Sequence, residues 1–160
     1  MRRPHVLIVE DEAPKLLHIE RFLHSVADDL QIVAARSVNS ALDELEKMLP
    51  DLLLLDMSLP TFDIGERENG GRPQGFGGIE ILRYMALADL KCPTIVITGY
   101  EAFLRETGKH MDLSQMRSEL MTEFPDFLKG VLHYNSSYDE WKDSLSAVLR
   151  EIRIDKDGKK

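Results

Sequence analysis

Short, unbroken apolar runs recur along the chain, separated by segments whose apolar residues follow helical spacing. The runs at 6–9, 52–55 and 94–97 show no alternation of polar and apolar residues, which is typical of strands buried on both faces of a parallel sheet. The segments between them predict amphipathic helices, each crossing over to the next parallel strand. The expected strands are 5–10, 31–35, 52–56, 94–98 and 130–134, and the expected helices are 13–28, 38–50, 79–87, one beginning near 101, and 137–152.

Two connections are longer than this alternation needs. The segment 61–77 is rich in glycine and predicts a surface loop. The other long connection lies between Thr98 and the strand at 130–134, where methionine and leucine recur at helical spacing from 111 to 121. Such a stripe packs into a core more often than it binds a partner, and both interpretations stay open. We expect this second enlargement between the fourth helix and the last strand.

Polar side chains stand where three of the predicted strands stop. Glu10 and Asp11 follow the first run, Asp56 ends the third predicted strand, and Thr98 ends the fourth. Because the carboxyl ends of parallel strands lie along one edge of a sheet, these side chains are expected to meet in one crevice. The alternative is that they are ordinary solvated groups at strand ends.

A crevice lined by carboxylates suits a magnesium ion. Mg²⁺ prefers octahedral oxygen ligands and usually takes one or two carboxylates together with phosphate and water. We expect Asp11, Asp56 and the backbone carbonyl of Met57 to bind it directly, and Glu10 to act through a water molecule. Three carboxylates repel one another in the empty site, so the cation should also stabilise the fold.

Four motifs carry a resemblance to a known family. They are VLIVEDE at 6–12, PDLLLLDMSLP at 50–60, the Gly-Ile-Glu at 78–80 and the Thr-Gly at 98–99. In this order the chain resembles the receiver domain of two-component response regulators (CheY-like) over about residues 4–153. The resemblance implies a doubly wound, flavodoxin-like sheet of five parallel strands in the order 2-1-3-4-5. It also implies that Asp56 is the phosphoacceptor, with Mg²⁺ as cofactor, and that Thr98 is the switch hydroxyl.

The sequence departs from this family at the end of its last strand. The family carries a lysine there, and Tyr134 stands at the corresponding position. A phenol can donate one hydrogen bond but brings no positive charge to a phosphoryl group. Lys129 lies at the wrong end of the strand to compensate. Lys109 or His110, in the segment after the fourth strand, could instead fold back toward the site. Val131 stands where the family has its switch aromatic residue.

Length and composition exclude several classes of protein. The chain has 160 residues, enough for one domain with a hydrophobic core. Its net charge of −8 argues against a nucleic-acid-binding surface. No run is long enough to span a membrane, and the only cysteine, Cys92, cannot form an internal disulfide. We expect a cytoplasmic receiver domain at 1–153 with a polar tail at 154–160.

Three functions are compatible with these features. The first is a stand-alone response regulator that takes a phosphoryl group from a histidine kinase or phosphotransfer protein and signals through a downstream protein target or a homodimer. It would catalyse only its own phosphorylation and dephosphorylation. The second is a pseudo-receiver that binds proteins without phosphorylation, which Tyr134 and the two enlargements favour. The third, a phosphohydrolase with an aspartyl-phosphate intermediate, lacks its second acid because Ser58 stands there.

Overall fold

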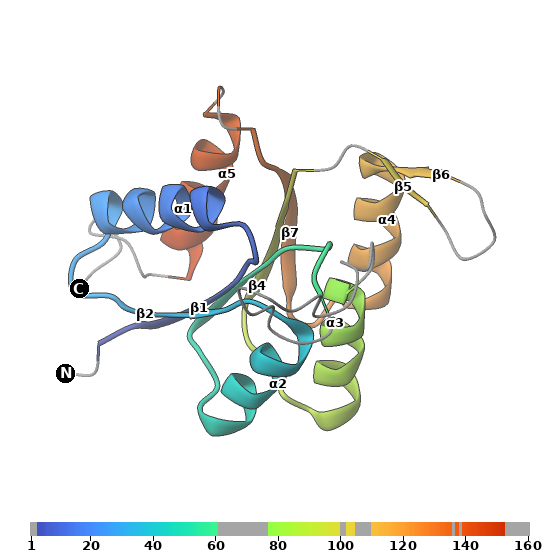
Figure 1. Cartoon of the computed structure of the whole chain (residues 1–160), viewed down its shortest axis with the longest axis horizontal. Helices are drawn as coiled ribbons and strands as arrows, with labels where there is room; N and C mark the ends of the chain where they lie inside the picture. The colour runs from blue at the N-terminus through green and yellow to red at the C-terminus, as the bar shows by residue number, and fades with distance from the viewer. Residues whose placement is uncertain are drawn as a thin grey trace, which may run out of the picture.

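The fold follows the predicted alternation of strands and helices (Figure 1). The computed structural model describes residues 3–60, 77–99, 102–104, 110–135, 137 and 139–152. The loop predicted at 61–77 and the polar tail at 154–160 therefore fall almost wholly outside the described residues. The elements are β1 (His5–Val9), α1 (Ala13–Val26), β2 (Gln31–Ala35), α2 (Val38–Lys47), β3 (Leu52–Leu55), α3 (Gly77–Ala88), β4 (Thr94–Thr98), β5 (Ala102–Leu104), β6 (His110–Asp112), α4 (Leu113–Glu123), β7 (Leu128–His133) and α5 (Glu140–Glu151).

Five of the strands form one parallel sheet in the order β2-β1-β3-β4-β7. This confirms the predicted order 2-1-3-4-5, with β7 as the fifth strand. Val9 at the end of β1 pairs with Leu55 at the end of β3. Thr98 at the end of β4 pairs with His133 at the end of β7. The register thus brings the carboxyl ends of the four strands β1, β3, β4 and β7 to the same edge.

Helices cover both faces of the sheet, with α1 and α5 on one face and α2, α3 and α4 on the other (Figure 1). Alternate residues of each central strand face opposite layers, which is why the strands are apolar throughout. In β3, Leu53 and Leu55 pack against α2, α3 and α4, while Leu52 and Leu54 pack against α1 and α5. The sheet therefore has a hydrophobic core on each of its two faces.

The region between β4 and β7 differs from the prediction. The helix α4 begins at Leu113 rather than near 101, because Asp112 and Gln115 cap its first turn with reciprocal side-chain hydrogen bonds. The added length lies before α4, where β5 and β6 pair as an antiparallel hairpin. The connection from α4 to β7 is short, so the predicted enlargement at that place was wrong.

The methionine and leucine stripe of this region packs inward. Met116 and Leu120 on α4 are buried in the same core as α2 and α3. The core interpretation is thereby confirmed for these two residues, and α4 covers the sheet like the other helices. Among the described residues, no helix combines the length and the apolar composition that crossing a bilayer requires.

Candidate functional site

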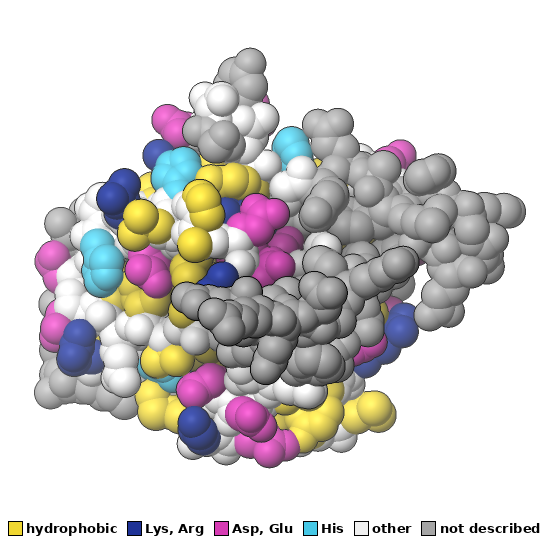
Figure 2. Space-filling model, viewed as in Figure 1, with side chains coloured by type: hydrophobic (Ala, Val, Ile, Leu, Met, Phe, Trp, Pro, Cys, Tyr) yellow, Lys and Arg dark blue, Asp and Glu magenta, His cyan; other side chains and the backbone are white. Residues whose placement is uncertain are grey.

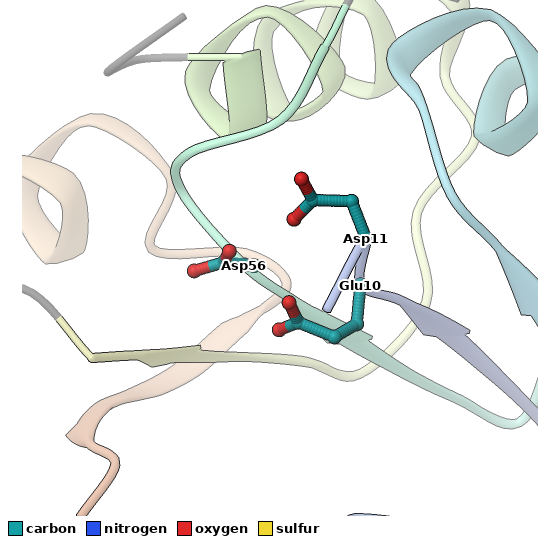
Figure 3. Close-up of side chains that lie close together, drawn as sticks. All are labelled: Glu10, Asp11 and Asp56. Atoms are coloured by element: carbon teal, nitrogen blue, oxygen red, sulfur yellow. The ribbon is translucent and has the colours of Figure 1, made fainter. Parts of the chain in front are cut away.

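Three carboxylates gather at the carboxyl edge of the sheet. Glu10 and Asp11 directly follow β1, and Asp56 directly follows β3. Because these strands are hydrogen-bonded neighbours, their side chains meet, and one oxygen from each carboxylate lies within 4.8 Å of the others. Figure 3 shows the three carboxylates turned toward a common point. In the space-filling view, one group of acidic side chains lies near the middle of the face shown, and others lie along its lower and left margins (Figure 2).

Two of these acids are almost completely buried. Glu10 is 1% exposed and Asp56 is 5% exposed. Burial raises the pKa of Glu10 to about 7. Burial likewise raises the pKa of Asp56, against the opposing attraction of Lys15, and it raises the pKa of Asp11. The site therefore resists holding several negative charges at once unless a cation is close.

Backbone N–H groups fix the orientation of the two buried acids. The N–H of Glu12 donates to Glu10 Oε2 at 3.0 Å. The N–H of Met57 donates to Asp56 Oδ1 at 2.9 Å. Each carboxylate is thus held by the turn that follows its own strand, and both are presented in a fixed geometry.

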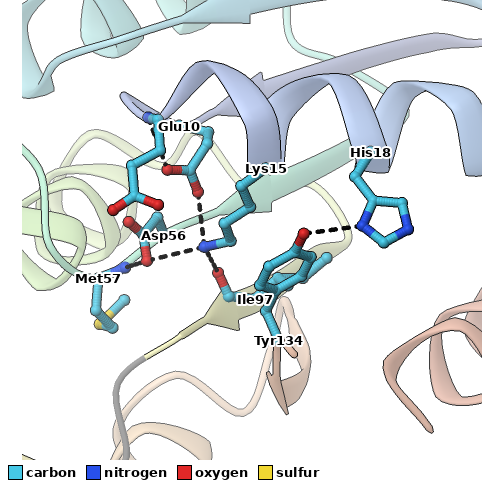
Figure 4. A network of polar contacts seen from close by, with 8 residues as sticks. Glu10, Lys15, His18, Asp56, Met57, Ile97 and Tyr134 are labelled. Carbon is cyan, nitrogen blue, oxygen red and sulfur yellow. Dashed lines mark hydrogen bonds and ion pairs between the residues drawn. The ribbon is translucent and has the colours of Figure 1, made fainter. Parts of the chain in front are cut away.

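A cation that the sequence analysis did not single out lies among these acids. Lys15, in the first turn of α1, is 4% exposed. Its Nζ lies 2.6 Å from Glu10 Oε1 and 3.3 Å from Asp56 Oδ1, and it donates to the carbonyl of Ile97 at 2.8 Å (Figure 4). Burial alone would lower the pKa of Lys15, but the attraction of Asp56 and Glu10 outweighs it and raises that pKa. Lys15 is therefore a charged ammonium inside the site.

The sequence did contain a signal for Lys15. The buried residues of α1 are Lys15, Ile19 and Leu23, spaced four apart on one face. A lysine in line with two core residues needs a buried partner for its charge, and Glu10 lies only five residues before it. The family resemblance directs attention to the end of the last strand, and to the segment after β4, as the source of a positive charge. The side chains of Lys109 and His110, considered there, lie outside the described residues.

Tyr134 turns its hydroxyl away from the acids. It follows β7, and its backbone N–H donates to the carbonyl of Thr98 at 2.8 Å. Its phenolic oxygen lies 2.8 Å from His18 Nδ1 on α1, and its ring centroid lies 5.4 Å from Lys15 Nζ (Figure 4). The ring, and not the hydroxyl, therefore borders the ammonium, as in a cation–π contact.

Two further predicted site residues lie beside the acids. Thr98 is fully buried at the end of β4, on the strand next to β3. The backbone carbonyl of Met57 accepts a hydrogen bond from the N–H of Gly78 at 2.9 Å. A carbonyl oxygen has two lone pairs, so only the second would be left for a cation. The roles assigned to Thr98 and Met57 stay predictions.

A cavity opens over Asp56. It has a volume of about 190 Å³ and is lined by Glu12, Lys15, Asp56, Gly99 and Tyr134. The buried acid is thus reachable from one side. A small anionic group could enter this cavity and meet the carboxylate and the ammonium together.

Comparison with known proteins places the chain in a family. Residues 6–116 match the model of the response regulator receiver domain, and the chain belongs to this family of signalling domains. It is 26% identical over 152 residues to the Detocs response regulatory protein DtcB of Enterobacter cloacae (strain JD6301), covering 92% of this chain and 99% of that protein. It is 30% identical over 165 residues to the transcriptional regulatory protein TrcR of Mycobacterium tuberculosis, covering 94% of this chain but 56% of that protein.

Solved structures share the fold at low sequence identity. The signal receiver domain of a putative LuxO repressor protein from Vibrio parahaemolyticus superposes with a TM-score of 0.66 at 18% identity, covering 96% of this chain and 95% of that one. The response regulator TrrA from Thermotoga maritima, solved in complex with Mg²⁺ and BeF, gives a TM-score of 0.60 at 19% identity, covering 91% and 99%. At these identities the likeness establishes the fold alone.

Proposed function

We propose that Asp56 accepts a phosphoryl group from the phosphohistidine of a histidine kinase or phosphotransfer protein. Mg²⁺ would be held by Asp11, Asp56 and the backbone carbonyl of Met57, with Glu10 acting through a water molecule. The observation that carries this proposal is the convergence of three carboxylates at the ends of β1 and β3, one of which, Asp56, lines a cavity. Family membership and the Mg²⁺–BeF complex of TrrA support it. A downstream protein would then bind the surface changed by phosphorylation.

The geometry favours Asp56 over Glu10 as the acceptor. Glu10 is held at Oε1 by Lys15 and at Oε2 by the N–H of Glu12. Within the described part of the chain, both polar contacts of Asp56 fall on Oδ1, and Asp56 lines the cavity whereas Glu10 does not. The second oxygen of Asp56, Oδ2, is therefore the better placed nucleophile.

The transfer is a displacement at phosphorus. Asp56 Oδ2 forms a bond to the phosphorus atom as the bond from phosphorus to the donor imidazole nitrogen breaks, and the electron pair returns to that nitrogen. Mg²⁺, when bound, neutralises charge on the phosphoryl oxygens. The chain itself fixes the carboxylate through the Met57 N–H, and Thr98 would donate its hydroxyl to a phosphoryl oxygen after transfer.

Beryllofluoride, a phosphoryl mimic, tests this proposal through Trp141, the only tryptophan. Trp141 is buried, and its ring centroid lies 5.4 Å from that of Tyr134, which borders Lys15. We expect its fluorescence to change on addition of beryllofluoride only when Mg²⁺ is present. Asp56→Asn should abolish the change, and the exposed control Asp43→Asn should keep it. A response that persists in Asp56→Asn, or no response in the wild type, would favour the phosphorylation-independent binding module instead.

The role of the Tyr134 hydroxyl can be separated from that of its ring. Tyr134→Phe removes the hydrogen bond to His18 Nδ1 and keeps the ring beside Lys15. We expect the free energy of unfolding to fall by about 1 kcal/mol and the beryllofluoride affinity to stay within about twofold of the wild type, since a factor of two is under 0.5 kcal/mol. Chemical denaturation and the Trp141 titration measure the two quantities. A large loss of affinity would mean that the phenol itself contacts the phosphoryl group.

A further inference from the structure

The acidic site contains a buried cation supplied by a helix, although the expected place for one was the end of the last strand. Lys15 Nζ contacts carboxylates from two different strands, at 2.6 Å from Glu10 and 3.3 Å from Asp56. Its third contact, the carbonyl of Ile97, belongs to β4. Lys15 therefore ties α1 to the ends of three strands at the point where the carboxylates meet (Figure 4).

Two interpretations of Lys15 have to be separated. A buried lysine between two acids could serve only to neutralise them and so keep the fold intact. A lysine with that role alone would not need to border the cavity. Lys15 instead lines the same cavity as Asp56. Its ammonium is thus both buried by protein and presented to the space above the carboxylate.

The distances indicate which contact can change. The contact to Glu10 is short, and the hydrogen bond to Ile97 anchors the ammonium to β4. The contact to Asp56 is the longest of the three. A phosphoryl group on Asp56 would carry its oxygens into the cavity that Lys15 lines. An ammonium has three donors and can direct one of them to such an oxygen without leaving its two other partners.

We propose that Lys15 is the residue whose ammonium contacts the phosphoryl group on Asp56, so that this charge comes from α1 and not from the strand end where Tyr134 stands. The inference rests on the proposed function of Asp56. It explains how the site can hold a dianionic group although Tyr134 brings no charge. The Tyr134 ring lies against the ammonium and its hydroxyl lies against His18, so both restrict where Lys15 can move.

The position of Lys15 also indicates which part of the molecule would respond to phosphorylation of Asp56. Lys15 borders the ring of Tyr134, and the rings of Tyr134, His18 and Phe22 all lie against Trp141 at centroid distances of 5.2–5.5 Å. A shift of the ammonium toward a phosphoryl oxygen would therefore reach α1 and α5. Trp141 reports on that face of the sheet directly.

The test compares two affinities in the same variants. Lys15→Met keeps the length of the side chain and removes the charge. We expect Mg²⁺ to bind it at least as tightly as the wild type, because no ammonium competes for the oxygens of Glu10 and Asp56. We expect its beryllofluoride affinity, measured at saturating Mg²⁺, to fall about 10- to 100-fold, the usual effect of losing a charged hydrogen bond. A variant that keeps its Mg²⁺ affinity but loses beryllofluoride affinity has lost a contact to the phosphoryl group and not the structure of the site.

Two further variants complete the set. Lys47→Met removes a lysine that is 72% exposed on α2, and it should leave both affinities unchanged. The double variant Lys15→Met with Tyr134→Lys places an ammonium at the strand end. Since the ring of Tyr134 already reaches within 5.4 Å of the Lys15 ammonium, a lysine there should recover at least part of the lost beryllofluoride affinity.

The outcomes distinguish this inference from the function on which it rests. No Asp56-dependent beryllofluoride response in the wild type would overturn both. A wild-type response that Lys15→Met retains at equal affinity would overturn the inference and leave the function of Asp56 standing. If Lys15→Met fails to fold, NMR of the lysine Nζ groups in the wild type decides, with Lys15→Arg used to assign the signal. A beryllofluoride-induced shift of the Lys15 signal supports the inference, and an unmoved signal overturns it.

Discussion

Replacement of Gly78 by alanine is expected to lower the free energy of unfolding by about 2–3 kcal/mol. A Cβ at position 78 would lie 2.5 Å from the carbonyl oxygen of Asp56 and 2.9 Å from the Cα of Met57. Both atoms belong to the backbone that leaves β3, so neither can move away as a flexible side chain would. The helical preference for alanine over glycine would return about 1 kcal/mol, which is less than the clash costs.

The substitution would also displace the functional site, because the backbone that the new Cβ would clash with includes the carbonyl group of Asp56. The N–H of Gly78 also donates to the carbonyl of Met57, so α3 and the turn after β3 are held together at this point. Urea denaturation measures the effect, and Gly130→Ala is the matched control, since the nearest atom to its Cβ is the tip of Leu132 at 3.9 Å. Equal unfolding midpoints for the two variants would contradict the close approach of α3 to Asp56.

Without a divalent cation, the protein is expected to lose stability as the pH rises from about 4.5 to 7. Burial raises the pKa of Glu10 from 4.5 to about 7 in the folded state. In this window the folded protein binds more protons than the unfolded chain, so the free energy of unfolding falls with rising pH. The raised pKa values of Asp11 and Asp56 act in the same direction. At about 1.4 kcal/mol per pKa unit, the loss is on the order of 1–3 kcal/mol.

Urea denaturation at several pH values, with and without Mg²⁺, measures this effect. Mg²⁺ favours deprotonated carboxylates and should flatten the dependence. Glu10→Gln removes the carboxyl group whose pKa burial raises to about 7, so the stability of this variant should depend on pH less than that of the wild type. A wild-type stability that rises through this window more steeply than that of Glu10→Gln would refute the assigned burial of Glu10.

The strand-end acids could be predicted from the sequence because their positions follow from local pattern alone. An apolar run that stops on a carboxylate places that carboxylate at the edge of a parallel sheet, whatever the rest of the chain does. The positions of Glu10, Asp11 and Asp56 could be predicted from this pattern, and the structure brings the three side chains together. The strand order likewise followed from the family resemblance and was confirmed.

Lys15 and the β5–β6 hairpin could not be predicted in the same way. Nothing in the neighbourhood of Lys15 says that its side chain points toward Asp56, because that contact joins residues 41 positions apart across two elements. Only its place on the buried stripe of α1 hinted at a buried charge. The two hairpin strands have three residues each, too few for a period-two pattern to stand out.

Transfer of a phosphoryl group to the intact protein tests the central claim most directly. The protein with Mg²⁺ would be incubated with acetyl phosphate, whose bond from phosphorus to the acetate oxygen breaks as Asp56 is phosphorylated, and the modified peptide would be located by tandem mass spectrometry. We predict the mass of one phosphoryl group on the peptide that contains Asp56, absent without Mg²⁺ and absent in Asp56→Asn. A phosphoryl group located on another residue, or no modification at all, would contradict the account.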